Sequence, residues 1–220
     1  TLRSVIADAP SHTRFWIDET YIEYVGSEHS LEAFAESSRN TVVCKSMSKV
    51  YALSGARVGY LSGPPLLIDE LRSHSPPWAV SLPAQVAAVE ALRNPAYYHT
   101  QYNATHQLRA ILAKHLRATI PGIDIIPGIA NSLLCHFPPG GPTAAQLVRA
   151  CRLQDLFIRD ASGMGRALGN RAIRIAVKDY TTNKRMIDVL TNCWHMLTTN
   201  DAHQSHAVSD PKQMPDSHRS

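Results

Sequence analysis

The residues with the clearest potential for chemistry lie between positions 46 and 60, where Lys49 follows a short apolar run at residues 41–44. We expect that run to be a buried strand, and open α/β sheets bind ligands beyond the carboxyl ends of their strands. A lysine at such an edge, among apolar neighbours, can lose its charge and act as an amine nucleophile. Arg57 is expected to open the next strand and could hold an anion at the same edge. A solvated loop lysine beside an ordinary ion-pairing arginine would have the same spacing.

A carboxylate and a phenol follow a second apolar run, at residues 15–17. Asp18 comes directly after it, and Tyr21 lies three residues later. A carboxylate at the end of a strand can hold a protonated ring nitrogen, and a nearby phenol can reach a neighbouring oxygen. An aspartate in this place also commonly caps the following turn. Both interpretations fit these residues.

Two arginines near the end of the chain lie in apolar surroundings. Arg159 and Arg174 are fifteen residues apart, and each lies in a short expected strand. A charge within a strand needs a partner, and arginine binds carboxylate or phosphate groups in a bidentate manner. The alternative is that both side chains face solvent and form salt bridges.

The first part of the chain alternates between expected strands and helices. Strands are predicted at residues 15–17, 41–44 and 57–61, and helices at 31–36, 66–73 and 83–92. Strands followed by helices over short connections predict an α/β fold with a mostly parallel, doubly wound sheet. We assign residues 1–95 to this larger domain.

The pattern changes after Pro95. A long amphipathic helix is predicted over residues 96–118, and a final helix over 181–197. Short strands are predicted between them, including 156–159 and 172–177. Residues 96–198 are therefore expected to form a smaller α+β domain, and the polar residues 199–220 a disordered tail.

Composition excludes several classes of protein. The 220 residues carry a net charge of only +4 and contain no run of four basic residues, which argues against nucleic-acid binding. The uncharged stretches contain prolines, serines and other polar residues, and none has the roughly 18 consecutive apolar residues of a membrane span. The four cysteines are widely spaced, so we expect reduced thiols in a cytoplasmic protein. We predict no metal site, since the histidines lack zinc-ligand spacing.

Five stretches together resemble a known family. They occur in the family's order over about residues 10–198, at positions 18–21, 46–60, 77–85, 158–160 and 172–177. The chain resembles the carboxyl-terminal part of the fold-type I pyridoxal-phosphate enzymes. It is most similar to the class I/II aminotransferases of the histidinol-phosphate aminotransferase type, with threonine-phosphate decarboxylase as a close relative.

The resemblance implies pyridoxal 5′-phosphate as the cofactor. Lys49 would bind it covalently and later move a proton, Asp18 would hold its ring nitrogen, and Tyr21 would bond its phenolic oxygen. Its phosphate would be bound by Ser46, Ser48 and Arg57.

The resemblance also implies the substrates. Arg174 would hold an α-carboxylate and Arg159 a second anionic group, so the substrates would be an amino acid or phosphorylated amine and a 2-oxo acid. The working protein would be a homodimer. The segment around Trp78 is closer to the decarboxylase relative, which leaves decarboxylation of a phosphorylated amino acid as an alternative.

Two further alternatives concern catalysis itself. Only 17 residues precede Asp18, so the family's phosphate-cupping glycine turn and ring-stacking aromatic residue have no counterpart in this sequence. We therefore expect a catalytically incomplete fragment, and a non-catalytic binding module is an alternative. Ser46 and Lys49 also fit a serine-hydrolase pattern, but its Ser-Asp-Asn and Lys-Thr-Gly partners do not occur.

Overall fold

The computed structural model describes residues 1–207 and divides the chain into two compact units. The first is Thr1–Ala104 and the second Thr105–Ser220. The division falls within one continuous helix, α5 (Pro95–Thr119), whereas the sequence suggested a boundary at residue 95, where this helix begins.

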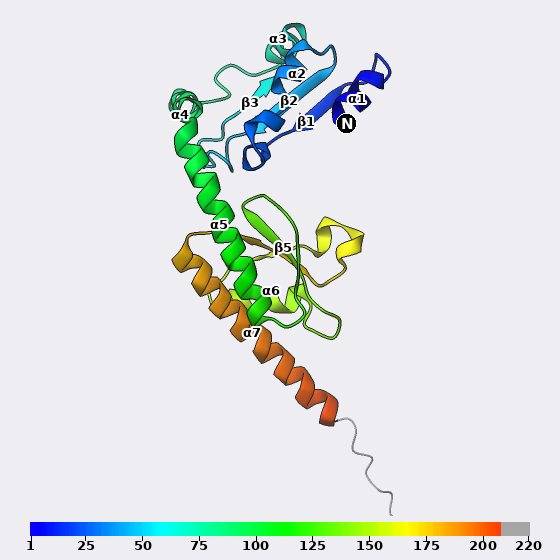
Figure 1. The fold of residues 1–220 in the computed structure, drawn as a ribbon, viewed down its shortest axis with the longest axis vertical. Helices are drawn as coiled ribbons and strands as arrows, with labels where there is room; N and C mark the ends of the chain where they lie inside the picture. The colour runs from blue at the N-terminus through cyan, green and yellow to red at the C-terminus, as the bar shows by residue number, and fades with distance from the viewer. Residues whose placement is uncertain (208–220) are drawn as a thin grey trace, which may run out of the picture. The chain divides into compact units, whose positions relative to one another are not determined.

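The first unit is built around a three-stranded sheet (Figure 1). Its strands are β1 (Phe15–Asp18), β2 (Thr41–Ser46) and β3 (Gly59–Ser62), with β2 in the middle. The helical elements of this unit before α5 are α1 (Leu2–Asp8), η1 (Ile22–Tyr24), η2 (Ser27–His29), α2 (Glu32–Ser37), α3 (Pro65–Ser73) and α4 (Leu82–Arg93).

The central strand is the part of this unit that the sequence determines most directly. Thr41, Val42 and Val43 are β-branched residues that favour extended backbone, and all three are buried. Val43 packs against Leu31 and Ala35 beside α2. Burial of both faces explains why β2 lies inside the sheet and why its sequence shows a continuous apolar run.

The expectation of a mostly parallel sheet is wrong for the strands that the structure describes. β1 and β2 are parallel, but β2 and β3 are antiparallel. A parallel connection needs a crossover, usually a helix, whereas the segment between Ser46 and Gly59 returns as a hairpin-like loop. Arg57 does not open a strand as predicted, because β3 begins two residues later, at Gly59.

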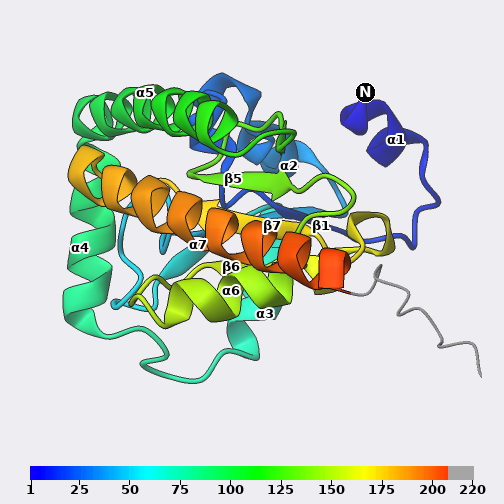
Figure 2. The ribbon, with the colours of Figure 1, turned by 90° about the horizontal axis from the view of Figure 1, so that it is seen from below.

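The second unit contains an antiparallel sheet with the order β4-β5-β7-β6. The strands are β4 (Asp124–Ile126), β5 (Ser132–His136), β6 (Arg159–Asp160) and β7 (Ala172–Ala176). The helical elements are the end of α5, α6 (Ala144–Arg152), η3 (Ser162–Met164), η4 (Arg166–Leu168) and α7 (Tyr180–Ala207). α6 and α7 lie side by side (Figure 2).

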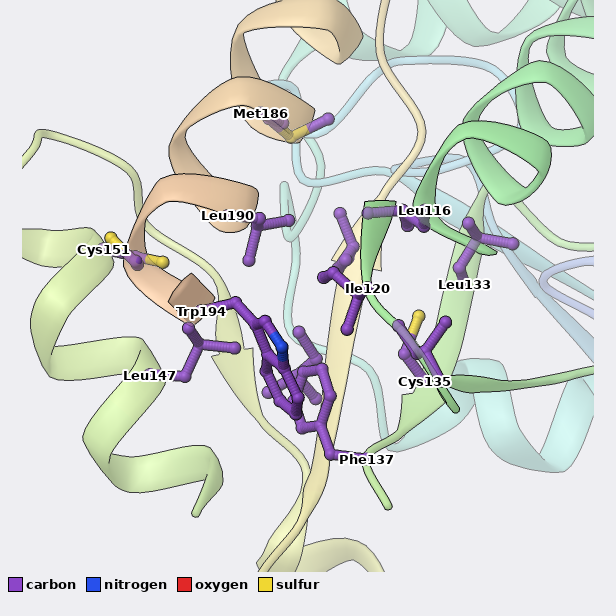
Figure 3. Packing of buried hydrophobic residues seen from close by; sticks show 14 of the residues in the cluster. Leu116, Ile120, Leu133, Cys135, Phe137, Leu147, Cys151, Met186, Leu190 and Trp194 are labelled. Carbon is purple, nitrogen blue, oxygen red and sulfur yellow. The ribbon is translucent and has the colours of Figure 1, made fainter. Parts of the chain in front are cut away.

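The core of the second unit joins this sheet to its helices (Figure 3). Phe137 follows β5 and stacks at a tilt on Trp194 of α7, with ring centroids 5.0 Å apart. Leu116 of α5, Leu147 of α6 and Leu190 of α7 are fully buried around them. The apolar faces of three helices therefore meet over one face of the sheet, which gives this unit its own core.

Two boundaries in the second unit differ from the sequence expectation. β6 covers only Arg159 and Asp160 rather than residues 156–159, because these are the residues that pair with β7, opposite Arg174 and Ile173. α7 continues to Ala207, so residues 199–207 are helical and not a disordered tail. Residues 208–220 of that expected tail lie outside the described residues.

Candidate active site

Asp18 and Ser46 end two neighbouring parallel strands and therefore lie at the same edge of the sheet. Asp18 pairs in register with Cys44, and the N–H of the next residue, Glu19, donates to the Cys44 carbonyl over 3.0 Å. This is the edge at which open α/β sheets bind ligands.

The Asp18 carboxylate is exposed and oriented by its own turn. Its Oδ1 accepts hydrogen bonds from the Thr20 N–H (2.9 Å) and the Thr20 hydroxyl (2.6 Å). The turn-capping role considered from the sequence is thus present, and it fixes the carboxylate through one oxygen. Tyr21 is half-buried and packs against a cluster that includes Tyr24 and Tyr102.

Ser46, Ser48 and Arg57 form one polar group in the loop between β2 and β3. Arg57 Nη1 donates to Ser48 Oγ over 3.3 Å and to the Ser54 carbonyl over 3.0 Å, and the Ser48 N–H donates to Ser46 Oγ over 3.4 Å. A guanidinium beside two hydroxyls is a suitable donor set for a phosphate or carboxylate.

Arg57 reaches this group from an unusual backbone conformation. Its φ is 54°, in the left-handed region that few non-glycine residues adopt. Such a conformation costs about 1–3 kcal/mol and persists where surrounding structure enforces it. The adjacent Val58 provides that structure, because it is buried and its carbonyl accepts from the Met47 N–H over 3.2 Å.

The loop is fixed by its apolar residues, which leaves its polar residues at the surface. Met47 and Val58 are buried against three alanines of α4, and the Leu53 N–H donates to the Met47 carbonyl over 3.0 Å. Lys49 is exposed, so the apolar enclosure expected from the sequence is not found in the described residues. Its neighbour Val50 is buried and anchors the backbone beside it.

The backbones of β2 and β3 approach each other closely at the point where the loop between them begins and ends. Gly59 pairs in register with Ser46, and a Cβ added at Gly59 would lie 2.7 Å from the Lys45 carbonyl oxygen. Only glycine permits this approach without displacing backbone.

Sequence reasoning missed a buried ion-pair cluster next to this edge. Lys45 of β2 lies with its Nζ 2.9 Å from Glu23 Oε1 and 3.0 Å from Glu32 Oε2. The predicted strand ended at residue 44, so Lys45 was not expected to be buried, and no local pattern points to its carboxylate partners.

Arg159 and Arg174 lie directly opposite each other on β6 and β7. Like charges in that position repel each other. Within residues 1–207 neither arginine forms a side-chain ion pair, so the salt-bridge alternative is not supported there. A bound anion would relieve this repulsion, which makes the pair a candidate site for one or two anionic groups.

The site residues therefore form two groups, each within its own unit. The first unit brings together Ser46, Ser48 and Arg57, with Asp18 at the neighbouring strand end, and the second brings together the two arginines of β6 and β7.

Within the described part of the chain, no helix has the length and apolar composition needed to cross a membrane.

The sequence profile of the family described as "Aminotransferase class I and II" matches residues 1–190. The chain belongs to this family. The family resemblance predicted from the motifs is confirmed.

Among curated aminotransferases of this family, the chain is similar to the histidinol-phosphate aminotransferase of Rhodopseudomonas palustris (strain BisB5). The two are 32% identical over 192 residues, which is 84% of this chain and 50% of that protein. The chain thus spans about half the length of the curated relatives that it matches.

Solved structures of similar fold include relatives with different activities. The L-threonine-O-3-phosphate decarboxylase of Porphyromonas gingivalis superposes with a TM-score of 0.73 at 25% identity, over 87% of this chain and 57% of that one. The histidinol-phosphate aminotransferase of Sinorhizobium meliloti, solved in complex with pyridoxal-5′-phosphate, gives a TM-score of 0.72 at 22% identity, over 90% of this chain and 52% of that one. The α/β fold expected from the resemblance is thereby confirmed.

Proposed function

We propose that this chain is the cofactor-binding and substrate-binding part of a pyridoxal-phosphate-dependent aminotransferase. The observation that carries the proposal is the group of Ser46, Ser48 and Arg57 beside Lys49, in a chain that belongs to the aminotransferase family. In this proposal residues 1–95 belong to the large domain and residues 96–198 form the small domain.

The donor set fits the phosphate of the cofactor. The Arg57 guanidinium and the hydroxyls of Ser46 and Ser48 lie together, and each charge-assisted hydrogen bond contributes about 1.5–3 kcal/mol. The close approach at Gly59 leaves the backbone beside Ser46 free of an obstructing side chain. These features support a built anion site at the end of β2.

The remaining residues of the first unit would act on the ring and its aldehyde. Asp18, at the end of the adjacent strand, holds the protonated ring nitrogen, and Tyr21 hydrogen-bonds the phenolic oxygen. When bound, the cofactor draws electrons away from the substrate Cα. Lys49 holds the cofactor through its amine and afterwards carries the proton that leaves Cα.

The arginine pair of the second unit supports a substrate with two anionic groups. Arg174 holds the α-carboxylate and Arg159 a second group such as a phosphate. Together with the similarity to a histidinol-phosphate aminotransferase, this favours a phosphorylated amine or an amino acid as donor and a 2-oxo acid as acceptor.

Decarboxylation of a phosphorylated amino acid is the second candidate function. It is favoured by the likeness to the threonine-phosphate decarboxylase. The resemblance of the segment around Trp78 to that relative, noted from the sequence, favours it as well. The two functions differ in which bond at Cα is broken, so the products distinguish them.

We also propose that the protein works as a homodimer in the cytoplasm. Leu82, Val86 and Val89 lie along α4 and are 71%, 54% and 44% exposed, and Trp78 is 94% exposed. A row of exposed apolar side chains of this kind favours association with another copy.

Cofactor attachment is the decisive experiment. The full chain is incubated with pyridoxal phosphate and treated with borohydride, which converts a carbonyl-to-lysine bond into a stable amine, and its peptides are then mapped by mass spectrometry. We expect the label on Lys49 and its loss in Lys49→Ala. A label on Lys45, or no specific label, would contradict the proposal. A chain that binds the cofactor without turnover would fit both the expected catalytically incomplete fragment and the binding-module alternative.

A product assay then separates the two candidate functions. Labelled glutamate with a 2-oxo acid, and a phosphorylated amino acid in a parallel reaction, are offered to the loaded protein. Appearance of a new amino acid supports transamination, whereas release of carbon dioxide from the phosphorylated substrate supports decarboxylation.

A further inference from the structure

Lys45 is the centre of a buried ionic cluster in the first unit. Its side chain is only 4% exposed, and its Nζ lies 2.9 Å from Glu23 Oε1, 3.0 Å from Glu32 Oε2 and 3.7 Å from Glu19 Oε2. The carboxylate side chains of Glu19 and Glu23 are themselves only 5% and 8% exposed. One buried ammonium thus joins three segments of the chain.

Further donors hold the carboxylates in place. Glu19 accepts hydrogen bonds from the Leu31 N–H and the Ser30 hydroxyl, both over 2.7 Å. The phenols of Tyr51 and Tyr60 lie beside Glu23 and Glu32, and burial together with these carboxylates raises the pKa of Tyr51 to about 12 and raises that of Tyr60.

This cluster is poorly designed for stability alone. Three carboxylates surround one ammonium, and Glu23 Oε2 is buried without a hydrogen-bond partner among residues 1–207. Buried ion pairs are often no more stabilising than apolar residues of similar volume, and their best-attested role is to specify one arrangement of the chain. The cluster therefore calls for an explanation other than stability.

The cluster lies one residue away from the candidate site on both strands. Glu19 directly follows Asp18, and Lys45 directly precedes Ser46. Successive residues of a strand point to opposite faces, so the Lys45 side chain and the Ser46 side chain leave β2 on opposite sides. The Glu19–Lys45 pair thus ties the ends of β1 and β2 together from behind the site.

The third strand is joined to the cluster in the same way. Tyr60 is the register partner of Lys45, and Gly59 is the register partner of Ser46. The half-buried Tyr60, paired with Lys45 and lying beside Glu32, therefore extends the cluster to β3 at the point where the loop that carries Arg57 returns to the sheet.

We propose that Lys45 is a positioning residue for the cofactor site: through Glu19, Glu23 and Glu32 it sets the distance between Asp18 and the Ser46–Ser48–Arg57 group. The inference rests on the proposed function for what the site binds. Its structural part, that Lys45 orders the loop between β2 and β3, does not.

The test compares three variants of the full chain. Lys45→Met removes the charge and keeps a long side chain, Lys45→Arg keeps the charge, and Val43→Ala is the matched control. Val43 is buried on the same strand and the same face, two residues away, but takes no part in the cluster. Hydrogen exchange of residues 46–58 measures loop order, urea unfolding measures stability, and a pyridoxal phosphate titration measures affinity.

We expect Lys45→Met to speed exchange in residues 46–58. We also expect it to raise the dissociation constant at least about tenfold, because misplacing Arg57 removes a charge-assisted hydrogen bond to the phosphate, and one such bond corresponds to about tenfold or more in affinity. Lys45→Arg should restore both. Unchanged exchange in Lys45→Met would overturn the inference. Equal loosening by a Val43→Ala variant of equal stability would also overturn it, since the effect would then be one of general destabilisation.

The inference can still be tested if Lys45→Met does not fold or if the wild-type chain binds no pyridoxal phosphate. If Lys45→Met does not fold, the double variant K45M/E23Q removes one uncompensated carboxylate, and wild-type exchange and affinity in that variant would overturn the inference. If the wild-type chain binds no pyridoxal phosphate, the proposed function fails, while the exchange comparison still decides whether Lys45 orders the loop.

Discussion

The contact between Gly59 and the backbone of β2 allows a quantitative prediction for Gly59→Ala. The added Cβ would lie 2.7 Å from the Lys45 carbonyl oxygen and 3.4 Å from the Ser46 Cα. Ordinary contact begins near 3.4 Å, so the two strands must separate by about 0.7 Å, the difference between 3.4 and 2.7 Å. Backbone atoms of a paired strand cannot move aside as the end of a side chain can.

The loss of unfolding free energy in Gly59→Ala follows from comparison with Gly55, a glycine of the loop that precedes β3. Overpacking a closely packed site costs about 1–3 kcal/mol, whereas replacing glycine by alanine lowers the entropy of the unfolded chain and adds about 0.4–1 kcal/mol of stability. Gly55 has no atom within 4 Å of an added Cβ, so Gly55→Ala experiences only the second effect. The entropy contribution cancels between the two variants, and Gly59→Ala should be less stable than Gly55→Ala by about 1–3 kcal/mol.

Urea unfolding of the full chain, followed by circular dichroism, measures this difference, and hydrogen exchange of the β2 and β3 amides locates it. Because Gly59 pairs with Ser46, we expect Gly59→Ala also to weaken binding of pyridoxal phosphate, while Gly55→Ala leaves it unchanged. Equal unfolding midpoints for the two variants would show that the approach of the strands is not rigid, and would refute the reasoning.

Three further predictions concern protonation, thiols and substrate. Burial alone lowers the pKa of Lys45, but hydrogen bonds to its carboxylate partners outweigh it and raise the pKa, and burial raises the pKa of Tyr51 to about 12. Both groups bind their protons more tightly in the folded chain, and so does the buried Cys135 thiol, whose pKa rises from 9.0 to about 12. The free energy of unfolding should therefore begin to fall near pH 9 and fall further as the pH rises toward 12. A level curve from pH 8 to pH 12 would contradict this. Burial raises the pKa of the Cys135 thiol to about 12, so iodoacetamide at pH 8 should modify the half-buried Cys44 first by peptide mass spectrometry, and the reverse order would contradict the packing. Arg159→Ala should raise KM for a phosphorylated amine more than for alanine, and equal effects would assign Arg159 a structural role.

The sequence predicts the elements whose residues all favour one structure. The strand at residues 41–44 and the strand beginning at Ala172 are runs of β-branched and apolar residues, and both were placed within two residues of their observed ends.

Features that depend on pairing between distant residues could not be predicted in this way. The direction of β3 depends on the path of the loop, and the meeting of Arg159 with Arg174 depends on strand register. The burial of Lys45 depends on carboxylates 13 to 26 positions earlier in the sequence, which no periodicity reveals. The residue patterns left a turn-capping role for Asp18 and a solvated loop position for Lys49 open, and the family resemblance selected the cofactor roles proposed for them.

The left-handed backbone at Arg57 has a consequence for how this protein responds to selection. A glycine at position 57 would relieve a conformation that costs an arginine about 1–3 kcal/mol, yet it would remove the guanidinium that faces Ser48. A library screened only for thermal resistance would therefore enrich glycine at this position and lose the anion site. Stability and activity make opposite demands on this single residue, so improved variants of this chain have to be screened for both properties at once.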